Sequence, residues 1–168
     1  MSHPMSGLLP KKGDAPMAEI NEIKLEITKN PNNPANLFSE IRYSVQGNDD
    51  DVANERKYRE ICELIGDDTP GDGQDDALYL VRDLTMQFSG TAVVYVHDTV
   101  LDLPKSLYDE DRDTAMPKPD ELRARVTLIP IVEREPVFST ENAGVALAPA
   151  VITRESNQVV LNAINPIG

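Results

Sequence analysis

Hydrophobic and polar residues alternate along several stretches of this chain, and a period of two is typical of strands with one buried face. Near the beginning, Ile23, Leu25 and Ile27 alternate with polar residues. A second alternating stretch covers residues 37–45, and residues 30–34 between them contain two prolines and three asparagines, which favour a turn. The pattern therefore predicts two strands that pair antiparallel across a short turn.

The same alternation recurs in the second half of the chain. It is clearest between residues 122 and 128, where four apolar residues alternate with polar ones: Leu122, Ala124, Val126 and Leu128. Pro130 has no backbone N–H, which restricts the end of this strand to a sheet edge or a bulge. Further strands are predicted at residues 84–88, 92–96, 145–153 and 158–163. Seven or eight strands predict an all-β fold, and we expect a single antiparallel β-sandwich rather than a barrel, with at most one short helix.

Residues 52–65 fit two different elements. Four apolar residues recur there at the spacing of one helix face: Tyr58, Ile61, Cys62 and Ile65. Gly66 follows at the position of a helix C-terminal cap, and Asp50 and Asp51 would favour the helix N-terminus. The alternative is a strand of the sandwich with Tyr58, Cys62 and Leu64 facing inward. The spacing favours the helix.

The length of 168 residues is that of one domain. Residues 1–18 contain three prolines and no periodic pattern, so we expect a flexible N-terminal leader before a β-sandwich domain at residues 19–168. No apolar run has the length of a signal peptide, and none approaches the roughly 20 residues of a membrane span. The chain is therefore expected to be soluble, and its compartment stays open.

The net charge of −13 is concentrated in two connecting segments. Residues 48–76 contain eleven acidic residues against three basic ones, and residues 98–121 contain eight against three. Acidic and basic residues balance in the rest of the chain. Such a chain lacks the clustered Lys and Arg that nucleic acid requires, and a cation is the partner to consider first.

The acidic segments supply candidate ligands for calcium, which takes six to eight oxygen ligands, many from carboxylates. The candidates are Asp49, Asp51, Asp67, Asp68, Asp72, Asp76, Asp109, Asp111 and Asp113. The stretch from residue 109 to 113 reads D-x-D-x-D, although a helix–loop–helix calcium loop is excluded because its sixth position is Thr114 instead of glycine. Whether the two segments share one end of the sandwich depends on how many strands separate them. The alternative is a set of solvated turns.

No residue pattern typical of catalysis is present. His97 is expected to be a strand-end residue bonded to a neighbour or to water, and Cys62 a small core residue with an unreactive thiol. The sequence therefore predicts a non-enzymatic β-sandwich module that binds calcium through its acidic loops and acts in binding or adhesion. One alternative is a structural subunit that associates with itself or other proteins, in which the leader and residues 143–152 would pack against neighbouring chains or add a strand to an exposed edge. A hydrolase that uses a pair of carboxylates is a second alternative.

Overall fold

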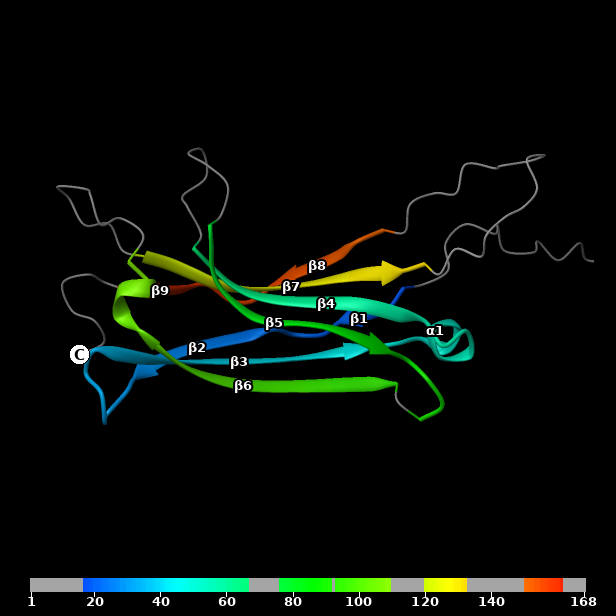
Figure 1. Cartoon of the computed structure of the whole chain (residues 1–168), viewed down its shortest axis with the longest axis horizontal. Coiled ribbons are helices and arrows are strands. Elements are labelled where there is room, and N and C mark those ends of the chain that lie inside the picture. Colours follow the sequence, from blue (N-terminus) through cyan, green and yellow to red (C-terminus); the bar gives the residue numbers. More distant parts are fainter. Residues whose placement is uncertain (1–16, 67–75, 92, 110–119, 133–149, 162–168) are drawn as a thin grey trace, which may run out of the picture.

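The computed structural model of the chain describes residues 17–66, 76–91, 93–109, 120–132 and 150–161. Its strands form two antiparallel sheets that pack face to face as a β-sandwich (Figure 1). The predicted fold class is confirmed. The described part contains nine strands rather than seven or eight, and one of them, β1, has only two residues.

The first sheet contains four strands: β1 (Glu19–Ile20), β2 (Lys24–Lys29), β3 (Asn36–Gln46) and β6 (Val94–Pro104). β3 pairs with β6 along its whole length, while β1 and β2 share its other side. The predicted antiparallel pair across residues 30–34 is confirmed, with Leu25 opposite Ile41. The Asn30 side chain accepts hydrogen bonds from two backbone N–H groups of the turn, which explains the asparagine there.

The second sheet contains five strands: β4 (Lys57–Gly66), β5 (Ala77–Gln87), β7 (Asp120–Ile131), β8 (Ile152–Glu155) and β9 (Val159–Leu161). β4 lies between β5 and β7, and β7 pairs on its other side with β8 and β9. The strand predicted at residues 122–128 is confirmed, since all four of its apolar residues are fully buried. Pro130 lies beyond the residues of β7 that pair with β8. The backbone N–H that proline lacks is therefore not needed for the described hydrogen bonds between these two strands. Residues 145–149 and 162–163 of two predicted strands lie outside the described residues.

The helix predicted at residues 52–65 is wrong. The chain forms one short helix, α1 (Asp49–Ala53), and then enters β4. Inward positions of β4 alternate and are fully buried: Tyr58, Glu60, Cys62 and Leu64. The alternative, a strand with Tyr58, Cys62 and Leu64 facing inward, is therefore correct, and Glu60 is a further inward residue. Glu60 obscured the alternation of apolar and polar residues, because a charged residue is rarely buried without a partner.

α1 ends after five residues, and Glu55 adopts the left-handed conformation (φ 48°) before β4 begins. At its start Asn48 and Asp51 form a capping box, in which each side chain accepts a hydrogen bond from the other's backbone N–H. The predicted effect of an acidic residue at a helix N-terminus is therefore present, since Asp51 caps α1. The helix, however, ends before the apolar residues of β4 begin.

The core consists of the facing sides of the two sheets together with residues that close the ends. Phe88, directly after β5, packs its ring edge-on against Tyr58 and Tyr95, with ring centroids 5.8 and 5.6 Å away. A single turn of 3₁₀ helix, η1 (Lys105–Leu107), follows β6 and leads to the buried Tyr108. The Tyr108 hydroxyl lies 2.6 Å from the Ser39 hydroxyl, which satisfies both polar groups inside the sandwich.

β5 and β6 connect the two acidic segments. They run in opposite directions and belong to different sheets, so the chain crosses from one sheet to the other near α1. Asp76 and Asp109 consequently lie at the same end of the sandwich, opposite α1 (Figure 1). Of the predicted leader, only Met17 and Ala18 are described, and Ala18 is buried. None of the helices in the described ranges has the length and apolar character needed to cross a bilayer.

Candidate functional site

A buried network of polar side chains connects the two sheets and contains the titratable groups best suited to chemistry. Four strands contribute to it: Tyr43 from β3, Glu60 from β4, Arg82 from β5, and His97 with Thr99 from β6. The register of the strands brings these residues together, because Tyr43 is opposite His97 and Cys62, next to Glu60 along the inner face, is opposite Arg82.

Glu60 is the centre of this network and has no exposed surface. The Tyr43 hydroxyl donates to its Oε1, and His97 Nε2 lies 3.1 Å from its Oε2. Arg82 Nη1 lies 3.8 Å from Glu60 Oε1 and donates to His97 Nδ1, while Arg82 Nη2 donates to the Thr99 hydroxyl at 3.0 Å. Every charged group in the cluster therefore faces a polar partner.

The electrostatics of the cluster favour an ionised Glu60 beside a protonated Tyr43 and a protonated Cys62. Burial raises the pKa of Glu60, but the contacts with His97, Tyr43 and Arg82 outweigh burial, so its pKa lies below the ordinary value. Burial also raises the pKa of the Tyr43 hydroxyl, and it raises the pKa of the Cys62 thiol to about 12. At neutral pH the tyrosine and cysteine remain protonated beside a carboxylate.

Two residues of this region were singled out from the sequence, Cys62 and His97. Cys62 is fully buried, as predicted, and its raised pKa removes the thiolate that a nucleophile needs. The prediction that His97 ends a strand is wrong, because β6 continues to Pro104 and places His97 within the strand, facing inward. The sequence contained a signal for Glu60, namely a charged residue at an inward position of an alternating strand.

The nine predicted calcium ligands do not form one group. Asp67, Asp68, Asp72, Asp111 and Asp113 lie outside the described residues. Asp49 is exposed on α1, whereas Asp51 is buried and accepts hydrogen bonds from the Asn48 backbone and, at 2.7 Å, from the Tyr58 hydroxyl. Among the residues that the structure describes, no three His, Cys, Asp or Glu side chains are grouped in a way that could hold a metal ion.

Position along the sandwich separates these candidates into two sets. Asp49 and Asp51 precede β4, whose ten residues extend roughly 33 Å to the other end. Asp76 and Asp109 are exposed at that other end, where the Gly66 N–H donates to the Asp76 carbonyl. The length of β4 therefore excludes one ion shared by Asp76 or Asp109 with Asp49 or Asp51.

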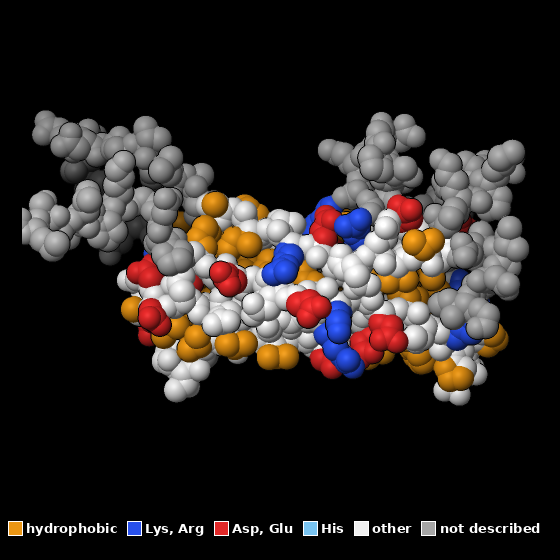
Figure 2. Space-filling model, turned by 180° about the vertical axis from the view of Figure 1, so that it is seen from behind, with side chains coloured by type: hydrophobic (Ala, Val, Ile, Leu, Met, Phe, Trp, Pro, Cys, Tyr) orange, Lys and Arg blue, Asp and Glu red, His pale blue; other side chains and the backbone are white. Residues whose placement is uncertain are grey.

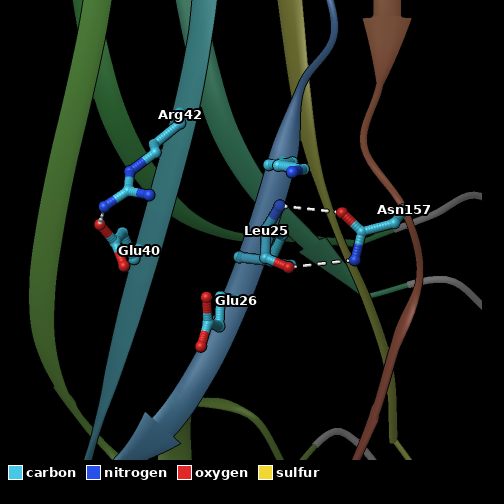
Figure 3. Close-up of a pocket in the computed structure, with 6 residues that line it drawn as sticks. Leu25, Glu26, Glu40, Arg42 and Asn157 are labelled. Carbon is cyan, nitrogen blue, oxygen red and sulfur yellow. Dashed lines mark hydrogen bonds and ion pairs between the residues drawn. The ribbon is translucent and has the colours of Figure 1, made fainter.

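The edge of the first sheet at β2 is covered by a side chain from the second sheet. The Asn157 amide accepts from the Leu25 N–H and donates to the Leu25 carbonyl, both at 3.0 Å (Figure 3). Asn157 and Leu25 also line a surface pocket with Glu40 and Arg42, two charged residues that pair with each other. Two of its charged residues therefore already pair with each other, and the backbone edge of β2 beside the pocket is occupied by Asn157.

Comparison with known protein families, with curated proteins and with solved structures finds no match to this chain.

Proposed function

We propose that this chain is a non-catalytic β-sandwich subunit that associates with copies of itself. The observation that carries this proposal is the number of large apolar side chains exposed on the described part of the sandwich. They are Tyr79, Leu80, Leu84, Val94, Val96, Val100, Ile131, Val132, Val151 and Val160. Figure 2 shows exposed hydrophobic side chains along the lower border of the molecule, where β6 lies. Apolar surface of this kind is typical of contacts with another protein when it forms a continuous patch.

The charge distribution supports association between copies despite the net charge of −13. The acidic excess belongs to the two connecting segments, while the rest of the chain carries balanced charge. At about 0.15 M salt, charges further apart than about 8 Å are largely screened, so most of the acidic residues of one copy do not repel those of another.

Sedimentation equilibrium over a range of protein concentrations tests this proposal. We expect a mass that is a multiple of the 18.5 kDa chain mass at high concentration, and dissociation on dilution. Association should strengthen between low and moderate salt, because salt screens the repulsion between two acidic copies. A monomer at every concentration and salt condition would contradict the proposal.

A second candidate function, calcium binding at the acidic end, is favoured by the path of β5 and β6. These two strands bring Asp76 and Asp109 to one end, so acidic residues of both connecting segments lie within one region of the molecule. Carboxylates supplied by neighbouring loops are suitable ligands for a calcium ion. Such a module would use the ion to order its loops or to bridge a partner.

Thermal unfolding in EDTA, in calcium and in magnesium at constant ionic strength tests the calcium proposal. Calcium at one hundred times its dissociation constant should stabilise the fold by about 2.7 kcal/mol, a rise of several degrees in Tm. The triple change Asp109→Asn, Asp111→Asn and Asp113→Asn should abolish the shift, and Asp49→Asn at the opposite end is the matched control. Equal shifts with calcium and magnesium would indicate charge screening and argue against a site.

A further inference from the structure

β6 presents a free edge, which follows from the hydrogen bonds at the two ends of its ladder with β3. The Gly47 N–H donates to the Val93 carbonyl at 2.8 Å, and the Lys105 N–H donates to the Ala35 carbonyl at 2.9 Å. Hydrogen-bonded pairs alternate along an antiparallel ladder, so odd-numbered residues of β6 bond to β3. The even-numbered residues direct their N–H and C=O groups away from β3, and no strand in the described part of the chain pairs with them.

The side chains of these even-numbered residues point out of the sandwich. They are Val94, Val96, Asp98, Val100 and Asp102, and the three valines are 49, 76 and 61% exposed. β6 keeps an uninterrupted register with β3 over eleven residues. A long, regular edge on which three of the five outward residues are valines can serve as a template for another strand.

The other described edges are less suitable. The β2 edge is occupied by Asn157, and Arg154 Nη1 donates to the Ile20 carbonyl of β1 at 2.6 Å. β8 and β9 have only four and three residues, and the register of β5 against β4 shifts twice. Short and bulged edges are poor templates for strand addition, so β6 is the favoured edge.

The charged residues on this edge already have partners within the chain, so they do not favour a basic peptide. Asp98 already pairs with Arg42 at 3.2 Å, and Asp102 accepts a hydrogen bond from the Asn36 side chain at 2.9 Å. No unpaired carboxylate on the edge is therefore left for a basic partner to neutralise. A second copy has apolar residues at the same positions, and a twofold contact uses the same surface on both subunits.

We propose that two copies of the chain pair antiparallel through the free edges of their β6 strands, with the twofold axis at Asp98. This inference rests on the self-association proposed above and names its surface. The register centred on Asp98 pairs all five outward residues, which no other symmetric register does. It places Val96 of each copy opposite Val100 of the other and joins the two four-stranded sheets into one. The two Asp98 residues lie opposite each other in this register, and the Arg42 guanidinium of each copy, 3.2 Å from its own Asp98, offsets their repulsion.

The first test changes Val96 and measures dimerisation of the full chain by sedimentation equilibrium. Val96→Pro removes an N–H that points away from β3, and Val96→Glu places a charge in the middle of the edge, so each should weaken association at least tenfold. Val96→Thr keeps the branched shape and should retain the dimer, and Val160→Glu makes the same charge change at an exposed valine of β9. An unchanged circular dichroism spectrum in each variant shows that the fold is intact.

The second test determines the register by disulfide formation under mild oxidation. Cys62 is buried, so an introduced cysteine supplies the reactive thiol. Asp98→Cys should form a disulfide-linked dimer, because opposing residues of a bonded pair have Cα atoms about 5.5 Å apart. Val94→Cys, which lies opposite Asp102 of the other copy in this register, should not form one.

The outcomes separate the two proposals. A wild-type chain that stays monomeric overturns both self-association and the β6 contact. A wild-type oligomer that survives Val96→Pro and Val96→Glu overturns the β6 contact and leaves self-association standing, with another surface responsible. Loss of the dimer in both variants, with the disulfide in Asp98→Cys only, supports the contact and its register.

Discussion

Replacing Glu60 with leucine should lower the free energy of unfolding by about 3 kcal/mol. The change removes the carboxylate that faces Tyr43, His97 and Arg82, and it leaves their polar groups without their central partner. Breaking a buried ion pair from one side typically costs about 3–5 kcal/mol. We expect the lower value because the Arg82 side chain retains some exposure and can turn toward water.

Urea unfolding of the wild type and three variants measures this effect. Glu26→Leu on β2 is the matched control, because Glu26 is exposed and its loss should change stability by less than about 0.5 kcal/mol. Glu60→Gln keeps the shape and an acceptor for Tyr43, so it should fall between the wild type and Glu60→Leu. Similar stabilities for Glu60→Leu and Glu26→Leu would show that the network contributes nothing to the fold.

The pH dependence of the same variants gives a second measure. Because the pKa of Glu60 is lower in the folded protein than in the unfolded chain, its contribution is fully present above the unfolded value of about 4.3. It is lost as the pH falls through the lower folded value. The stability difference between wild type and Glu60→Gln should therefore shrink on acidification below about pH 4.3, and a difference that grows would contradict this assignment.

Replacing Gly47 with alanine should also destabilise the protein by about 3 kcal/mol, the upper end of the usual cost of overpacking a core. A Cβ atom at this position would lie 2.6–2.8 Å from three ring carbons of Phe88. The ring cannot move aside easily, because Phe88 is fully buried between Tyr58 and Tyr95. Either the ring or the end of β3 must shift.

A double-mutant cycle tests this explanation. Phe88→Leu opens space beside Gly47, so the cost of Gly47→Ala should be smaller in the Phe88→Leu background than in the wild type. Gly90→Ala is the contrasting control, because Gly90 has a φ of 54° and no neighbouring atom within 4 Å of a Cβ. Its cost should arise from the backbone and be unaffected by Phe88→Leu. Strict additivity of Gly47→Ala and Phe88→Leu would refute the steric account.

Strands with a regular alternation of apolar and polar residues were predictable, because this pattern depends only on which face of the strand is buried. Residues 23–27 and 122–128 show a period of two without interruption, and both are strands in the structure. Residues 57–66 were misread, because an inward glutamate broke the apolar pattern. Glu60 is accommodated by residues 17 to 37 positions away along the chain, and a local pattern cannot report partners at that distance.

The candidate sites were also predictable only in part from the sequence. The sequence showed that acidic residues are concentrated in two connecting segments, but their relative position depended on the path of β5 and β6. The structure places Asp76 and Asp109 at one end and assigns Asp51 to a helix cap at the other. His97 was recognised as a residue of interest, and its partners became apparent only when β6 was packed against β4.

The sequence by itself determined the all-β class, the antiparallel pairing of the first long strands and the concentration of charge, because alternation and composition are local properties. The tertiary structure alone decided which edges are open. Asn157 occupies the backbone of Leu25 across 132 residues of sequence, whereas the outward N–H and C=O groups of β6 have no described partner. The sequences of β2 and β6 both alternate between inward and outward residues. Only the packing of segments distant in sequence distinguishes the covered edge of β2 from the free edge of β6.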